Sequence, residues 1–288
     1  ALNYTRAYQI GTSEQKYQAA LSLALLYAGN RDYDQATQWA QKIDSADNIT
    51  DRETLLASLA SEQKNWTVAL QHAKTALDSQ ITSKNPVFTR QEISSLYAYI
   101  LTQSQPPEQA LAEINRQLAQ LDTQKSSPTY AIERSSLVYQ RGLLYSDKLG
   151  QPEKAAADFR TYLIHNPDSA QGQNALGYNL LDMGKAHLPE AIALISAAYQ
   201  KEPNNPQIAD SMGWAHYQNG EYQKAQTLLA QAYEQDKNAE IGAHLGAALW
   251  QLGKHRQAKK IWQASWQKEA GNPALQKILK EFNISFEQ

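Results

Sequence analysis

Cysteine is absent from the 288 residues, which excludes disulfides, cysteine-ligated metals and thiol catalysis. Glycine and proline are scarce, at 13 and 10 residues, and this disfavours an all-β chain with a turn every few residues. Long apolar runs are also missing. No segment approaches the roughly 18–20 apolar residues that a membrane-spanning helix needs, so we expect no membrane insertion by this chain.

An excess of positive charge is missing as well. Lys and Arg together number 27 against 29 for Asp and Glu, which gives a net charge of −2. Nucleic-acid-binding proteins usually carry a basic surplus or a basic face, so we expect no nucleic-acid partner. The chain begins at Ala1 without a capping motif, and we expect further repeats and any targeting signal to precede it.

What the sequence does contain is an internal repeat of 33 to 36 residues. A glycine recurs at this spacing within helix-like stretches, a second glycine follows seven or eight residues later, and an alanine then opens another apolar stretch. The three series are Gly142, Gly177, Gly213 and Gly246; Gly150, Gly184, Gly220 and Gly253; and Ala155, Ala191, Ala225 and Ala258. The alanine series continues backwards less regularly to Ala110, Ala69 and Ala36.

Each repeat predicts two helices joined by a tight turn. In residues 209–218 and 222–236 the apolar residues follow helical spacing, and Asn219-Gly220 separates the two stretches. Small residues let paired helices approach closely, so we expect Gly213 to face Ala225 and Ala232 to face the following repeat.

The pattern resembles the tetratricopeptide repeat (TPR), with Pro167 and Pro203 at the positions where that repeat often has a proline. The resemblance implies an all-α fold, a right-handed superhelical solenoid of about seven helix pairs. Residues 1–121 form an irregular N-terminal part and residues 130–272 a regular array, with the polar stretch 122–129 between them.

Residues 273–288 form a terminal element. Leu275, Ile278, Leu279 and Phe282 make one apolar stripe at helical spacing, and a solenoid needs such a helix to cover its last exposed face. We therefore expect a C-terminal capping helix followed by a short tail. A helix lying on a membrane surface is the alternative interpretation of this stripe.

No catalytic motif is present, and we expect no catalytic residue, no cofactor and no metal site. None of the six histidines is paired at ligand spacing, although His216 and His244 could approach one another in a curved array. Asp210 and Glu240 have no visible partner that would shift a pKa. The chain is therefore interpreted as a non-enzyme.

A helical solenoid offers a concave groove lined by the first helix of each pair. The predicted protein-binding residues of this groove are Tyr139, Asn174, Tyr178, Asp210, Trp214, Tyr217 and Trp250. Tyr and Trp favour binding hot spots, which points to a protein or peptide partner. The alternative is that some of these rings pack between repeats. The Lys and Asn set that clamps a terminal carboxylate in some TPR proteins is not visible, and Asp210 would oppose it.

Three segments carry a closer resemblance. Residues 174–182 (NALGYNLLD), 208–217 (IADSMGWAHY) and 240–250 (EIGAHLGAALW) resemble the closing repeats of large TPR lipoproteins of Gram-negative bacteria. The resemblance implies a periplasmic adaptor, tethered to the outer membrane by a lipid anchor, that binds a carboxyl-terminal processing protease and its substrates. This chain lacks the lipid-bearing Cys, so the anchor would lie in a preceding segment.

Two alternatives stay open. In place of the adaptor, the chain would be a TPR segment of a larger enzyme or a scaffold component of a polysaccharide-export or pilus-assembly system.

Overall fold

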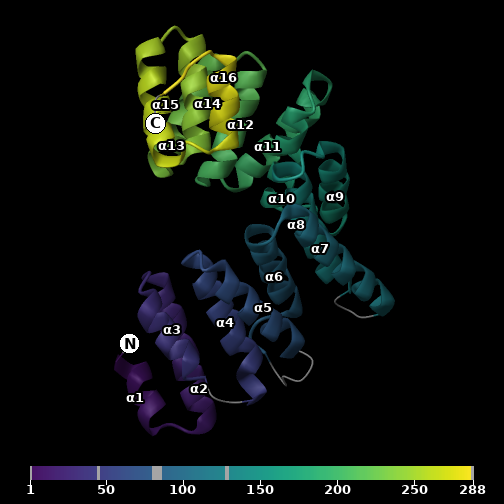
Figure 1. Cartoon of the computed structure of the whole chain (residues 1–288), viewed down its shortest axis with the longest axis vertical. Coiled ribbons are helices and arrows are strands. Elements are labelled where there is room, and N and C mark those ends of the chain that lie inside the picture. Colours follow the sequence, from purple (N-terminus) through teal and green to yellow (C-terminus); the bar gives the residue numbers. More distant parts are fainter. Residues whose placement is uncertain (1, 44–45, 80–85, 127–129, 287–288) are drawn as a thin grey trace. The chain divides into compact units, whose positions relative to one another are not determined.

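The computed structural model describes residues 2–43, 46–79, 86–126 and 130–286. In these ranges the chain forms sixteen α-helices, three 3-10 helices and no strand (Figure 1). The α-helices are α1 (Leu2–Ile10), α2 (Ser13–Gly29), α3 (Tyr33–Gln41), α4 (Ile49–Glu62), α5 (Trp66–Ser79), α6 (Arg90–Ser104), α7 (Pro107–Leu121), α8 (Tyr130–Asp147), α9 (Pro152–His165), α10 (Ala170–Asp182), α11 (Leu188–Lys201), α12 (Pro206–Gln218), α13 (Tyr222–Gln235), α14 (Ala239–Gln251), α15 (His255–Glu269) and α16 (Pro273–Glu281). The 3-10 helices are η1 (Ala46–Asn48), η2 (Asp122–Gln124) and η3 (Lys185–His187).

From α2 to α15 the described helices follow one another as seven consecutive pairs, with α16 after the last pair. The prediction of an all-α chain of about seven helix pairs with a C-terminal helix is therefore confirmed. The polar stretch 122–129 begins with η2, while its residues 127–129 lie outside the described residues.

The chain divides into two compact units, and the boundary along the sequence falls within α8, between Leu144 and Tyr145. We call them unit 1 and unit 2. The ranges 1–121 and 130–272 were predicted from how regular the repeat is. The two compact units divide the chain by a different property, so they do not test those ranges.

Small residues allow the helices of one pair to touch. A Cβ atom added to Gly213 would lie 2.6 Å from Cγ of Leu229, and one added to Gly177 would lie 2.6 Å from Cγ1 of Ile195. The nearest neighbour of a Cβ at Gly213 is Leu229, one helical turn along α13 from the Ala225 that the sequence pointed to. Ala232 does face the following repeat, where it packs with Ile241 of α14.

The turns inside four of the pairs, two in each unit, share one hydrogen-bond pattern. In unit 2, Gly220 has φ 77° and donates its N–H to the carbonyl of Tyr217, while the next N–H, of Glu221, bonds to His216. In unit 1, Lys64 has φ 57° and donates to Ser61, and Asn65 bonds to Ala60. Lys64 thus occupies the left-handed position that glycine fills in unit 2.

We expect opposite effects from substitutions at these two turns. A non-glycine residue in the left-handed region costs roughly 1–2 kcal/mol, part of which is offset by the smaller chain entropy of the unfolded state. Gly220→Ala should therefore lower the free energy of unfolding by about 1 kcal/mol, and Lys64→Gly should raise it by about 0.5 kcal/mol. Urea denaturation measures both.

Gly29→Ala is the control for these two variants. Gly29 ends α2 at an ordinary φ, and an added Cβ would meet nothing within 4 Å. This variant should be neutral or slightly stabilising, because alanine favours the helix. If Gly220→Ala were as stable as the wild type, the backbone argument would fail.

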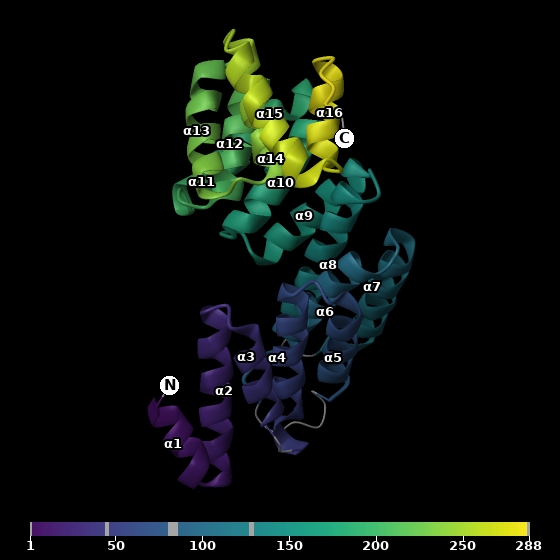
Figure 2. The ribbon, with the colours of Figure 1, turned by 60° about the vertical axis from the view of Figure 1, so that its left-hand side comes forward.

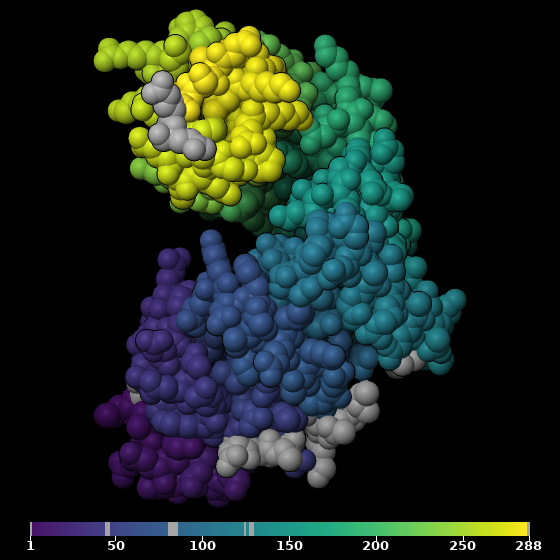
Figure 3. Space-filling model, in the orientation of Figure 1, coloured from purple at the N-terminus to yellow at the C-terminus, as the bar shows by residue number. Residues whose placement is uncertain are grey.

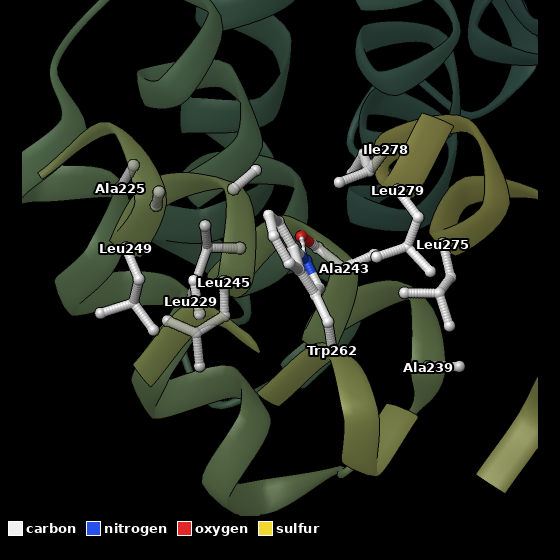
Figure 4. Packing of buried hydrophobic residues seen from close by; sticks show 13 residues of the cluster. Ala225, Leu229, Ala239, Ala243, Leu245, Leu249, Trp262, Leu275, Ile278 and Leu279 are labelled. Carbon is white, nitrogen blue, oxygen red and sulfur yellow. Dashed lines mark hydrogen bonds between the residues drawn. The ribbon is translucent and has the colours of Figure 1, made fainter. Parts of the chain in front are cut away.

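The C-terminal core of unit 2 is built around Trp262 of α15 (Figure 4). Trp262 is fully buried, and its indole N–H donates a 3.0 Å hydrogen bond to the carbonyl of Ala243. From α16, Leu275, Ile278 and Leu279 are buried in the same cluster. The prediction that this apolar stripe caps the array is therefore confirmed, and the stripe is not available to a membrane surface.

Helix α16 packs mainly on α14, the first helix of the last pair, and makes less contact with α15. Figures 1 and 2 show α16 (yellow) running beside α14. The space-filling view shows α16 exposed on the face of unit 2 turned toward the reader (Figure 3). The surface of the first helices in unit 2 is thus bounded at one end by the chain's own last helix.

Candidate functional site

The first helices of three successive pairs, α10, α12 and α14, contact one another in unit 2. They bring together four rings that we call the aromatic surface: Tyr178 from α10, Trp214 and Tyr217 from α12, and His244 from α14. Tyr178, Trp214 and Tyr217 are partly buried, whereas His244 is only 2% exposed.

Three of the four rings, those of Tyr217, Trp214 and His244, form a stack, and Tyr178 meets its His244 end at an interplanar angle of 56°. The Trp214 ring lies parallel to that of Tyr217, with centroids 4.5 Å apart and an interplanar angle of 7°. On α14, His244 stacks against Trp214 at 4.2 Å and 19°. Tyr178 reaches His244 at a centroid distance of 6.3 Å. Such ring pairs contribute about 0.5–1.5 kcal/mol each beyond their buried area, so the stack holds the three helices in register.

A buried carboxylate holds the His244 ring in place. Both carboxylate oxygens of Asp210 lie near His244 Nδ1, at 2.9 and 3.0 Å, and Asp210 is 5% exposed. Burial alone lowers the pKa of His244, but the adjacent charge and hydrogen bond of Asp210 outweigh it, and the pKa is raised. The sequence showed no partner for Asp210, and this contact corrects that interpretation: Asp210 is a buried positioning residue.

A second carboxylate fixes Tyr178. Its phenol donates a 2.6 Å hydrogen bond to Glu240 Oε1 at the start of α14. Burial, then the charges of Glu240 and Asp210, raise the pKa of Tyr178 well above its ordinary value, so the phenol keeps its proton and remains a donor. Glu240 therefore also has a partner that the sequence did not reveal.

The other predicted binding residues have different surroundings. Trp250 packs against both Trp262 and Phe282, with ring centroids 5.6 and 5.7 Å away, so the residue that ends α16 partly covers it. Asn174 on α10 is partly buried, and its Oδ1 has no hydrogen-bond partner among the described residues. Tyr139 on α8 is partly buried and belongs to unit 1. The structure thus brings Tyr178, Asp210, Trp214 and Tyr217 together, and a binding role for all seven residues stays a prediction.

Sequence reasoning missed His244 and Glu240 as parts of this surface, although a signal was present. His244 follows Asp210 by 34 residues, which is one repeat. Residues one period apart occupy equivalent places on neighbouring first helices, so pairing by period would have identified the contact.

In the ranges that the structure describes, no group of three or more His, Asp or Glu side chains is arranged to hold a metal ion. His216 and His244 each have their own carboxylate neighbour, Glu221 and Asp210. Among the described helices, none is long and apolar enough to cross a membrane.

Comparison with known proteins identifies the repeat. Two family models, both described as tetratricopeptide repeat, match residues 145–206 and 180–245. A TPR repeat-containing protein of Pseudomonas aeruginosa is 39% identical over 116 residues. The alignment covers 40% of this chain and 19% of that protein, so the match spans about a fifth of the relative.

Solved structures show the same fold. A tetratricopeptide repeat protein from Parabacteroides merdae has a TM-score of 0.58 and 17% identity, covering 92% of this chain and 98% of that one. A monomeric mutant of IFIT1 with m7Gppp-AAAA has a TM-score of 0.65 and 14% identity, covering 94% of this chain and 62% of that one. The family models confirm the predicted TPR repeats over residues 145–245, and the solved structures confirm the helical solenoid fold. Similarity at these identities shows the fold alone.

Proposed function

We propose that this chain, a tandem of tetratricopeptide repeats, is a non-catalytic scaffold that binds protein partners through the aromatic surface of unit 2. TPR proteins generally mediate protein–protein interaction. The observation that carries the proposal is the stack of His244, Trp214 and Tyr217, together with the tilted Tyr178 ring, across three repeats. Partly exposed Trp and Tyr rings are the commonest binding hot spots.

Rigidity favours this surface as a binding site. Asp210 fixes the His244 ring, His244 stacks on Trp214, and Glu240 fixes the phenol of Tyr178. Side chains that are already ordered lose little entropy when a partner docks, so more of the contact energy appears as affinity. The same contacts between repeats bury part of each ring, and the part that stays exposed is available to a partner.

The partner class follows from resemblance. The segments 174–182, 208–217 and 240–250 resemble the closing repeats of outer-membrane TPR lipoproteins, and a relative from the Gram-negative Pseudomonas aeruginosa aligns with part of the chain. In the proposed function the chain is a periplasmic adaptor, tethered to the outer membrane in the full-length protein. It binds a carboxyl-terminal processing protease and its substrates, and holding both on one scaffold raises their effective concentration.

Affinity capture from a periplasmic extract tests the site and the partner together. The wild-type chain should retain the protease, and a Trp214→Ala/Tyr217→Ala variant should retain at least about tenfold less, because hot-spot truncations cost about 2 kcal/mol or more. Trp266→Ala is the matched control, since this partly buried aromatic lies on the second helix α15. It should capture normally.

The stack makes one further control necessary. Trp214 packs on His244 and Tyr217, so its removal also costs folding stability, and all variants should be compared well below their melting temperatures. Equal capture by the double variant would remove the aromatic surface as the site. Capture of export or pilus proteins in place of the protease would replace the adaptor by the alternative scaffold role.

A further inference from the structure

Four carboxylates lie around the aromatic surface, one from each of α8, α10, α12 and α14: Asp147, Asp182, Asp210 and Glu240. They are close enough to act on shared neighbours. After burial, the charges of Glu240, Asp210 and Asp182 all raise the pKa of Tyr178. Desolvation raises the pKa of the Asp147 carboxyl, and the charge of Glu240 raises it further. The carboxylates thus surround one region of unit 2.

Only two of the four carboxylates have a positively charged group at salt-bridge distance. His244 pairs with Asp210, and the ammonium of Lys277 lies 3.0 Å from Asp182 Oδ1. Glu240 accepts a hydrogen bond from the neutral phenol of Tyr178. In the described ranges neither Glu240 nor Asp147 forms an ion pair, although the charge of the neighbouring Lys148 also acts on Asp147. Four carboxylates against His244, Lys277 and Lys148 leave this side of the surface with an excess of negative charge.

The chain itself already places a helix at the edge of this surface. Helix α16 buries Leu275, Ile278 and Leu279 in the unit 2 core beside α14, and its following residue Phe282 packs on Trp250. From the same helix, Lys277 extends to Asp182 on α10, 95 residues earlier in the chain. The edge of this surface therefore already holds an amphipathic helix whose lysine pairs with an acidic residue.

We propose that the aromatic surface, in the binding role proposed above, takes a basic amphipathic helix of a protein partner, docked beside α16. Lys or Arg residues of that helix lie against Asp182, Glu240 and Asp147, and its apolar face lies against Trp214 and Tyr217. The proposal follows from charge complementarity and from continuity with the α14–α16 packing. Helices recognise such surfaces through apolar residues at helical spacing, and Trp and Tyr rings attract cations.

The contact of Lys277 with Asp182 is exchangeable. The side chains are 74% and 51% exposed, and exposed ion pairs contribute little because water and salt screen them. A lysine or arginine from the partner can therefore replace Lys277 at small cost. It follows that Lys277 competes with the partner, and that removing it strengthens binding.

The test titrates the whole chain with a synthetic 14-residue helical peptide bearing leucines on one face and lysines on the other. A matched peptide carries glutamates in place of the lysines. We expect the lysine peptide to bind at least about tenfold more tightly at low salt, with the preference shrinking as salt is added. Lys277→Ala should tighten its binding about two- to fivefold, and Asp182→Asn should weaken it by a similar factor.

Control variants change the same charges elsewhere. Lys260→Ala on α15 and Glu234→Gln on α13 alter exposed residues of second helices and should leave the affinity unchanged. Equal affinity for both peptides, absence of lysine-peptide binding, or equal effects of Lys277→Ala and Lys260→Ala would each overturn the proposal. If the Trp214→Ala/Tyr217→Ala variant still lost its partner in that case, the proposed function would stand and only the basic helix would be wrong.

Discussion

Gly246→Ala should lower the free energy of unfolding of unit 2 by about 2–3 kcal/mol, the upper part of the range for overpacked cores. A Cβ atom at position 246 would overlap the indole of Trp262, whose N–H bonds to the carbonyl of Ala243. Trp262 is fully buried and packs with Trp250 and Phe282, so it has no free space into which it could turn. Either the hydrogen bond from Trp262 to Ala243 must break or the Trp262 ring must move from its packed position.

Gly271→Ala is the control for this substitution. Gly271 is exposed between α15 and α16, and an added Cβ would meet nothing within 4 Å. Urea denaturation followed by tryptophan fluorescence should show a lower midpoint for Gly246→Ala and an unchanged one for Gly271→Ala. Equal midpoints would mean that α14 and α15 are not packed as closely as described.

Asp210→Ala should be the most destabilising change on the aromatic surface, at about 3 kcal/mol, because it leaves the partner of a buried pair uncompensated. His244 is 2% exposed, and its Nδ1 has both oxygens of Asp210 as neighbours. Loss of Asp210 also frees the ring on which Trp214 stacks. Differential scanning calorimetry measures the stability, and near-ultraviolet circular dichroism reports the loosening of Trp214.

The same pair predicts how stability depends on pH. Since the folded-state pKa of His244 is raised above its unfolded value of about 6.5, its contribution is fully present below about pH 6.5 and is lost as the pH rises through the raised pKa. The free energy of unfolding of the wild type should therefore fall as the pH rises from about 6.5 through the raised pKa of His244.

Asp210→Asn tests this pH dependence. The variant keeps the size of the side chain but removes its charge, so the pKa of His244 should return toward or below its ordinary value and the stability decrease above pH 6.5 should disappear. Asp182, Glu240 and Tyr178 also face the ring. The Asp210→Asn variant leaves these three groups in place, so they do not account for a difference between the variant and the wild type. An unchanged slope in Asp210→Asn would contradict the assignment to this pair.

The sequence predicted unit 2 better than unit 1, and the turns explain the difference. Glycine fills the left-handed turn position at Gly220 and Gly253, which makes the repeat visible in the sequence. In unit 1, Arg31 and Lys64 adopt the same backbone with φ of 61° and 57°. The local geometry repeats there, but the residue type that signals it does not.

The polar contacts of the aromatic surface were less predictable. The sequence placed Tyr178, Asp210, Trp214 and Tyr217 on one surface, and these residues do meet in unit 2. It could not show that Asp210 points into the core toward His244 rather than into a groove, because burial depends on how neighbouring first helices pack. For the same reason, the α16 contacts that partly cover Trp250 could not be read from the apolar stripe alone.

Site-specific photo-cross-linking tests directly whether protein partners bind at the aromatic surface of unit 2. A photoreactive amino acid at Gln251, which is exposed on α14 and bonds to the Tyr217 hydroxyl, would sit beside the aromatic surface. One at Glu234, exposed on α13, would sit on a second helix. If partners bind at the aromatic surface, the bound partner is cross-linked from position 251 and not from position 234. Cross-linking from position 234 alone would contradict it.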